Sequence, residues 1–211
     1  ERIRAQSRTL SSTFAFAPLD EANLIVNGSA EVVNGQFVSG NYFRALGVSG
    51  IRGRAIAASD DRADATPVIV LSDALWSRHF DRDPGAIGQT LMVNAQPFTV
   101  VGIAPPGFTG ANGFSYQADF SMPLWVERRM FPDDEHDQPY SWWLCIMGRQ
   151  APGITRTQVQ AELERVFQAA ALDGWNAAPA RMAKRTTPPS VPRLQVLDGS
   201  GGLADQVRYF S

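Results

Sequence analysis

Two histidines and a few acidic clusters are the side chains whose types and spacing could do chemistry. His136 lies in the run Asp-Asp-Glu-His-Asp, where Asp133, Asp134 and Asp137 could bind a hard cation. The run lacks the alternating ligands and the distal glutamate of an EF-hand loop. We therefore interpret it as a solvated acidic turn and expect no metal site. His79 falls on the apolar face of a predicted helix, where we expect a satisfied, half-buried histidine and not a catalyst.

Nucleophilic, phosphate-binding and paired-carboxylate signatures are missing from the sequence. Cys145 lies within an apolar run, where a thiol is inert. Asp60 and Asp61 lie in a loop without an apolar pocket that would raise a carboxyl pKa. The glycine-rich runs have no following Lys-Ser or Lys-Thr pair, and no Gly-x-Ser-x-Gly elbow occurs. We expect no catalytic residue and no cofactor in this chain.

Composition narrows the class of protein. The chain has 211 residues, a formal net charge of −2 and no basic stripe, which argues against a nucleic-acid partner. No apolar run reaches the roughly eighteen residues that span a bilayer. A single cysteine excludes an internal disulfide framework and a cysteine zinc site. Because the first residue is a glutamate, we interpret the chain as a piece of a longer protein.

Periodicity and turn residues predict the elements that position these side chains. Asn27-Gly28 predicts a tight hairpin between two strands, and Asn94-Ala95-Gln96-Pro97 predicts a longer loop, because Ala95 resists a positive φ. Thr155 stands three residues before Gln158, the spacing of a capping box, and opens a helix whose Leu163 and Phe167 should pack on a sheet. The predicted strands cover residues 23–26, 30–38, 67–71, 90–93, 98–103, 120–126, 141–150 (central and buried on both faces) and 193–197, and the predicted helices follow residue 72 and span about 156–172. The order indicates a mixed α+β fold.

Aromatic residues admit two interpretations. The five tryptophans could form a sugar-binding platform, but four of them lie in predicted helices or strands beside other apolar residues, which favours core packing. The stretch Ser-Gly-Asn-Tyr-Phe is interpreted as a structural corner: Gly40 lets the chain turn, and Tyr42 and Phe43 anchor it in the core.

Four motifs follow each other in the order and spacing of one known family: VNGQFVSGNYFRALGVSGIRGRAIAASDD, PVIVLSDALWSRHF, GAIGQTLMVNAQPFTVVGIAPPGF and PLWV. The chain resembles the periplasmic core domain of MacB/FtsX-type ABC transporter permeases, above all those in which the unit is duplicated in one polypeptide. The resemblance covers about residues 30–170. Two minor departures are Ser49-Gly50, where relatives often carry a bulkier or proline-containing pair, and Asn94-Ala95, where Asn-Gly is usual.

The resemblance implies an α+β fold with two subdomains. Residues 1–55 and 138–211 would form a discontinuous α/β porter subdomain, and residues 56–137 a β-rich inserted sabre subdomain. The acidic loop near 57–66 and the charged stretch 127–139, both evident from the residues alone, agree with these boundaries. The two ends of the chain would each adjoin a membrane helix.

The resemblance also implies a function. The chain would be a non-catalytic periplasmic domain of an inner-membrane permease, which transmits ATP-driven motion (mechanotransmission) and docks a periplasmic adaptor or client. ATP would bind a separate or fused cytoplasmic ABC ATPase, reached through the flanking membrane helices, and the permease would be a dimer. Two alternatives stay open: a lipoprotein-release permease domain that handles a lipidated client and, from another class, a carbohydrate-binding or hydrolase module.

One loop is a candidate contact surface for a partner. Residues 107–116 place Phe108, Phe114 and Tyr116 among turn-forming residues, where local structure cannot bury all three. Aromatic side chains exposed on a loop are suited to anchor a partner. The alternative is that the rings pack back onto the adjacent sheet.

Overall fold

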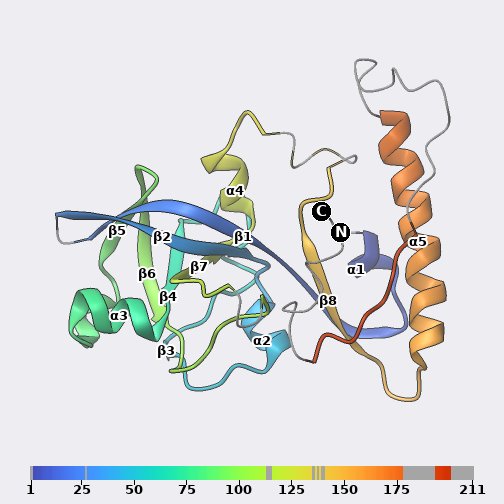
Figure 1. The fold of residues 1–211 in the computed structure, drawn as a ribbon, viewed down its shortest axis with the longest axis horizontal. Helices are drawn as coiled ribbons and strands as arrows, with labels where there is room; N and C mark the ends of the chain where they lie inside the picture. The colour runs from blue at the N-terminus through green and yellow to red at the C-terminus, as the bar shows by residue number, and fades with distance from the viewer. Residues whose placement is uncertain are drawn as a thin grey trace. The chain divides into compact units, whose positions relative to one another are not determined.

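The computed structural model describes residues 2–26, 28–112, 116–134, 136, 138, 141–177 and 193–200. The chain divides into two compact units. Among the described residues, the first unit comprises 2–13 and 133–198, and the second comprises 14–132 and 199–200. The elements of both units are labelled in Figure 1. The two units are described separately below.

The first unit is built on one long helix. It contains α1 (Arg2–Gln6), the start of β1 (Leu10–Val26), β8 (Cys145–Gln150) and α5 (Arg156–Ala177). The capping box predicted at the start of α5 is confirmed: the Thr155 amide donates to Gln158 Oε1 at 2.7 Å, and the Gln158 amide donates to Thr155 Oγ1 at 3.3 Å. α5 then buries a single apolar stripe made of Val159, Leu163, Val166 and Ala171.

The second unit is a closed β-barrel with short helices around it. Its strands, after β1, are β2 (Ser29–Val38), β3 (Arg52–Gly53), β4 (Val68–Leu71), β5 (Thr90–Val93), β6 (Gln96–Ile103) and β7 (Phe120–Pro123). The strands pair in the order β2-β7-β4-β6-β5-β1, and β1 also pairs with β2, so six strands form a ring. β3 pairs with β6 outside that ring. Closure leaves none of the six strands as a free edge of the barrel.

Large apolar side chains fill the barrel unit. Fully buried examples from four of the strands are Phe16, Leu24, Ile69, Leu71, Phe98, Phe120 and Met122. Burying a side chain of this size contributes about 1.5–3 kcal/mol to stability. The helices of this unit are α2 (Tyr42–Leu46), α3 (Asp73–Phe80) and α4 (Trp125–Met130), with a 3₁₀ turn, η1, at Pro84–Ala86.

The glycine-framed stretch at 39–43 is a structural corner, as the sequence indicated. Tyr42 and Phe43 are buried, and a Cβ on Gly40 would lie 2.6 Å from the Cα of Ala58. The acidic loop near 57–66 is attached to this corner. Asp61 accepts hydrogen bonds from the Gly40 amide at 2.9 Å and from the Trp125 amide at the start of α4 at 3.1 Å.

Of the two predicted turns between strands in the second unit, one is confirmed and one needs correction. The hairpin at residues 27–28 is confirmed by the pairing of Val26 with Ser29, although Asn27 itself lies outside the described residues. The longer loop predicted at 94–97 is wrong: Val93 pairs with Gln96, and Asn94 and Ala95 form a two-residue turn with φ of 46° and 61°. The Asn94 side chain stabilises this turn by accepting a hydrogen bond from the Asn23 amide at 2.8 Å.

Other predicted elements differ in length or kind. β1 begins at Leu10, not at residue 23, and β7 ends at Pro123, where α4 replaces the predicted end of a strand. The interpretation of residues 141–150 as a central buried strand is wrong. Only Cys145–Gln150 is strand, it ends the strand order, and Ile146 is 49% exposed. Residues 193–197 form no strand.

The packing of α5 and the division of the chain into units were also predicted. Leu163 is buried as predicted, whereas Phe167 is half-buried with its ring 5.1 Å from that of Trp142. The chain passes from one compact unit to the other at residues 13/14 and 132/133. These positions differ from the predicted porter and sabre boundaries at 55/56 and 137/138, and the two subdomains stay a prediction. In the described part of the chain, no helix is both long enough and apolar enough to cross a membrane.

Candidate partner-binding loop

The loop between β6 and β7, residues 104–119, carries the three aromatic side chains proposed to contact a partner. We call it the aromatic loop. Phe108 and Tyr116 are described, whereas Phe114 falls in 113–115, outside the described residues. Both described rings are half-buried.

Phe108 packs back onto the corner of the barrel unit. Its ring centroid lies 5.7 Å from that of Phe43 and 6.5 Å from that of Tyr42, the second pair in an edge-to-face arrangement. Such pairs contribute about 0.5–1.5 kcal/mol beyond the area they bury. Only the remaining exposed part of the Phe108 ring could contact a partner.

Tyr116 is held by its hydroxyl group. The hydroxyl donates to the Gly35 carbonyl at 2.6 Å and accepts from the Leu19 amide at 3.1 Å. Burial, together with the nearby carboxylate of Asp20, raises the pKa of Tyr116 well above its ordinary value. The hydroxyl therefore stays protonated and bridges the paired strands β1 and β2. This contact places the ring on the sheet; its role toward a partner stays a prediction.

A buried polar network lies beneath the aromatic loop, and it was not anticipated from the sequence. Gln36 donates to Ser121 Oγ at 2.8 Å and accepts from Asn112 Nδ2 at 3.2 Å. Tyr42 Oη accepts from the Ala111 amide at 2.8 Å, and burial raises the Tyr42 pKa to about 12. A signal was present in the sequence, because Gln36 is a polar residue in the apolar half of a strand.

The small cavity at this network cannot bind a substrate. It measures about 10 Å³ and is lined by Gln36, Ser121, Thr109 and other residues of the same unit. This volume is at the lower limit for one water molecule. The network therefore fixes the aromatic loop and offers no binding pocket.

His79 and Asp60, two of the side chains singled out from the sequence, each have a polar partner. His79 is half-buried and pairs with Glu31, which Arg78 also contacts at 3.2 Å. Asp60 binds the guanidinium of Arg54 through both oxygens, at 2.6 and 2.9 Å. Burial opposes ionisation of Asp60, but the hydrogen bonds from Arg54 and from the Ala57 amide outweigh it and hold the Asp60 pKa below its ordinary value. Burial also raises the pKa of the Cys145 thiol, which keeps it unreactive at neutral pH.

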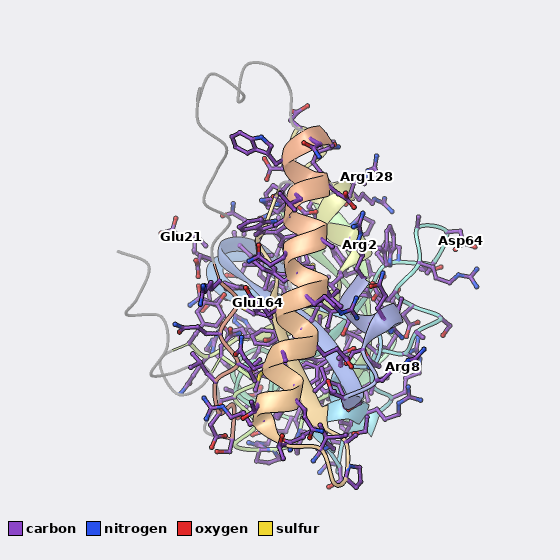
Figure 2. All side chains as sticks on the ribbon, turned by 90° about the vertical axis from the view of Figure 1, so that its right-hand side faces the viewer. Arg2, Arg8, Glu21, Asp64, Arg128 and Glu164 are labelled. Carbon is purple, nitrogen blue, oxygen red and sulfur yellow. The ribbon has the colours of Figure 1, made fainter. Side chains whose placement is uncertain are left out.

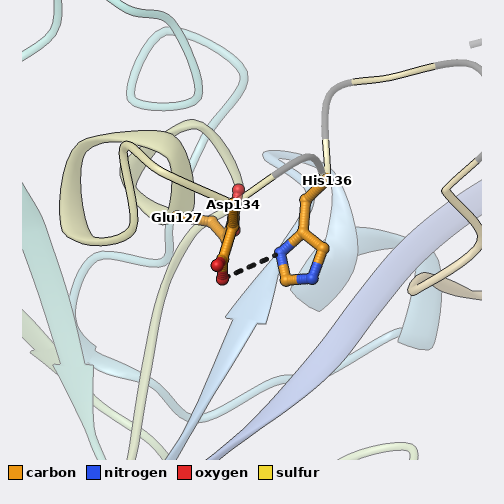
Figure 3. A group of neighbouring side chains, drawn as sticks. All are labelled: Glu127, Asp134 and His136. Atoms are coloured by element: carbon orange, nitrogen blue, oxygen red, sulfur yellow. Dashed lines mark ion pairs between the residues drawn. The ribbon is translucent and has the colours of Figure 1, made fainter. Parts of the chain in front are cut away.

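In the acidic turn, His136 contacts Asp134 and an aromatic ring. His136 Nδ1 lies 3.8 Å from Asp134 Oδ2, and the imidazole stacks on Trp143 at 4.7 Å. Figure 3 shows the ion pair between Asp134 and His136 as a dashed line. Asp137 lies outside the described residues. The ion pair and the stacking account for the position of His136.

The tryptophans are mostly held in place by their indole N–H groups. Trp76, Trp125 and Trp143 each donate to a backbone carbonyl, at 2.8, 2.6 and 2.9 Å respectively. Trp76 is 3% exposed, and Arg52 and Arg82 lie over its ring. Trp142, at 57% exposed, is the exception to the expected core packing. These anchored indoles support packing, not a flat sugar-binding platform.

Comparison with known families and structures gives a consistent result. Residues 2–166 match the family described as the MacB-like periplasmic core domain. The fold is similar to that of the periplasmic region of MacB from Actinobacillus actinomycetemcomitans, with a TM-score of 0.63, 14% identity, and coverage of 87% of this chain and 80% of that one. No curated protein matches the chain.

Two further solved structures share the fold. The extracellular domain of the noncanonical ABC-type transporter YknZ from Gram-positive bacteria has a TM-score of 0.59 and 10% identity, and covers 80% of this chain and 78% of its own. A domain from Porphyromonas gingivalis, described as part of a permease protein, has a TM-score of 0.55 and 13% identity, and covers 99% of this chain and 83% of its own.

Proposed function

Because the chain belongs to the MacB-like periplasmic core domain family, we propose that it transmits ATP-driven motion within an ABC transporter permease and carries out no chemistry itself. The domain is periplasmic, and its permease works with an ABC ATPase. ATP hydrolysis in the cytoplasm would move the membrane helices that flank the domain, and the domain would carry that displacement to a periplasmic adaptor or client.

The closed barrel is the observation that carries this proposal. A domain that transmits displacement must be stiff, because a compliant body absorbs the motion it receives. Strand pairing in the barrel unit closes on itself, and the acidic loop is fastened to α4 and to the corner at Gly40. These features support a stiff barrel unit.

Phe108, Tyr116 and Phe114 remain our candidates for partner contact. The aromatic loop is fixed at both described rings, so a partner would meet a preformed surface, which lowers the entropy cost of binding. We also propose that the permease acts as a dimer, so that two copies of the domain move against each other.

A disulfide lock tests motion transmission in the full-length permease. Single cysteines are introduced at exposed positions in a Cys145→Ser background, starting with Val32, which is 62% exposed, and screened for crosslinking between copies. In the crosslinked form, the transport phenotype of the host should be lost while basal ATP hydrolysis continues. Reduction with a thiol should restore transport, and the uncrosslinked cysteine variant is the matched control.

Two results would contradict the proposal. One is an unchanged transport phenotype in the fully crosslinked permease. The other is turnover of a small-molecule substrate by this chain alone, which would revive the hydrolase alternative.

A further inference from the structure

Residues 193–197 are attached to α5 along their backbone, although they form no strand. We call these residues the strap. The Leu194 amide donates to Glu164 Oε2 at 2.6 Å, and the Val196 amide donates to Gln160 Oε1 at 2.7 Å. Gln160 Nε2 in turn donates to the Leu194 carbonyl, and the Arg156 guanidinium donates to the Val196 carbonyl at 2.8 and 3.0 Å. Both amides and both carbonyls of Leu194 and Val196 are therefore held by side chains of α5.

The spacing of these side chains explains why the attachment fits. Arg156, Gln160 and Glu164 are four residues apart, so each step along the helix rises about 6 Å. Two residues of an extended chain advance about 6.6–6.8 Å and present their backbone groups to the same side. The helix stripe and the extended strap thus match in repeat, and the polar side chains of α5 take the place of a neighbouring strand.

A second set of contacts attaches the first residues of the chain to the same helix. Glu162 Oε1 accepts from the Arg8 amide at 2.7 Å and from the Thr9 amide at 3.3 Å. Arg2 pairs with Asp173 at 2.5 Å. The Ser7 hydroxyl and the two amides lower the pKa of Glu162, so its carboxylate is ionised at neutral pH.

The two sets of contacts occupy opposite flanks of the buried stripe of α5. At about 100° per residue, Glu162 and Asp173 fall on one side of Val159, Leu163 and Val166, and the stripe from Arg156 to Glu164 falls on the other. In Figure 2, where α5 faces the viewer, Arg2 and Arg8 lie to one side of the helix and Glu164 to the other. α5 thus binds a separate chain segment through polar side chains on each side of its apolar stripe.

We propose that α5 is a two-sided clamp that couples residues 2–9 to the strap, so that the two segments move together. This inference rests on the proposed function, in which displacement must pass through the domain. Gln160 and Glu162 are the positioning residues of the clamp, one on each flank. Each binds two backbone groups of its segment, so removing one side chain releases more than one bond.

Amide hydrogen exchange in the intact chain tests the clamp directly. In Gln160→Ala, which keeps a strong helix former in α5, the amide of Val196 loses its acceptor and should exchange at least about tenfold faster than in the wild type. The amide of Leu194 keeps Glu164 as its acceptor and should exchange faster by a smaller factor, because the Leu194 carbonyl loses its bond to Gln160. Because the flanks are coupled, the amides of Arg8 and Thr9 should also exchange faster, by about threefold or more. Glu162→Ala should produce the reciprocal pattern, and Glu162→Gln, which keeps an acceptor oxygen, should restore most of the protection at Arg8 and Thr9.

Gln195→Ala is the matched control, since it lies between the two bonded strap residues and leaves both of their amides in place. It should change neither set of exchange rates. Unaltered protection of Val196 in Gln160→Ala would show that the strap is not held by this side chain and would overturn the clamp. Faster exchange confined to the mutated flank would show that the flanks are independent, and would also overturn it. Neither result bears on the disulfide lock, which tests motion transmission separately.

Discussion

Asp60 and Asp61 are neighbours in the sequence but fasten different parts of the barrel unit. Asp61 joins the corner at Gly40 to the start of α4 through two backbone amides. Asp60, 8% exposed, binds Arg54 bidentately and accepts from the Ala57 amide at 2.8 Å. A run of acidic residues that looks like a solvated loop in the sequence is therefore a set of specific hydrogen-bond acceptors.

Asp60→Asn should lower the free energy of unfolding by about 2 kcal/mol, because a mostly buried acceptor loses its charge and one of its partners. Urea denaturation measures the change. The stabilisation has a defined pH dependence: since the folded pKa of Asp60 is depressed, its contribution is complete above the ordinary value of 3.8 and is lost as pH falls below it. The difference between wild type and Asp60→Asn should shrink correspondingly at low pH.

Asp64→Asn provides the control for this prediction. Asp64 pairs with Arg62 in the same loop, but both side chains are largely exposed, so the urea midpoint should not move. Equal effects of the two substitutions would show that burial of the Asp60 carboxylate is not what matters.

At the scale of elements, α5 combines a buried apolar stripe with hydrogen-bonding side chains on both sides of it. Its periodicity was readable from the sequence, and the capping box fixes where it starts. The helix extends to Ala177. It contains no proline, and its one glycine, Gly174, is buried within the helix and does not end it. Two leucines of this helix differ sharply in environment and allow a matched comparison.

Leu163→Ala should cost about 2–4 kcal/mol, because Leu163 is 8% exposed and its removal leaves a cavity. Leu172→Ala makes the same chemical change on the same helix, but Leu172 is 50% exposed, so its effect should stay within about 0.5 kcal/mol. Thermal unfolding followed by circular dichroism distinguishes the two. A similar loss of stability in both variants would refute the packing described for α5.

At the scale of the whole molecule, both histidines and the buried Asp60 contact another ionisable side chain. Asp134 and His136 contact each other, His79 contacts Glu31, and Asp60 contacts Arg54. A carboxylate that already accepts hydrogen bonds from a guanidinium and a backbone amide, as Asp60 does, would have to give up these bonds to bind a metal ion.

We therefore expect the purified chain to contain no metal ion at stoichiometric occupancy. Elemental analysis of protein purified without chelator measures this. The finding of one equivalent of calcium or zinc, lost in an Asp133→Asn, Asp137→Asn double variant, would contradict the expectation and assign a metal site to the acidic turn. A content far below one equivalent in both proteins is the expected result.

The sequence by itself determined the local elements with strong periodicity or turn chemistry. These include the hairpin after Val26, the start and apolar stripe of α5, and the corner at Tyr42 and Phe43. It also carried the family, through motifs spread over much of the chain. Such features depend on neighbours within a few residues, which the sequence displays directly.

Only the tertiary structure decided which distant segments meet. Barrel closure depends on pairings such as β2 with β7, and Glu162 binds Thr9 across 153 positions of the chain. The Asn94-Ala95 turn forms despite the positive φ of Ala95, because the pairing of β5 with β6 and the hydrogen bond to Asn23 outweigh that local cost. Likewise, the apolar run at 141–150 suggested burial on both faces, but burial depends on what packs against a strand, and its own residues do not specify that.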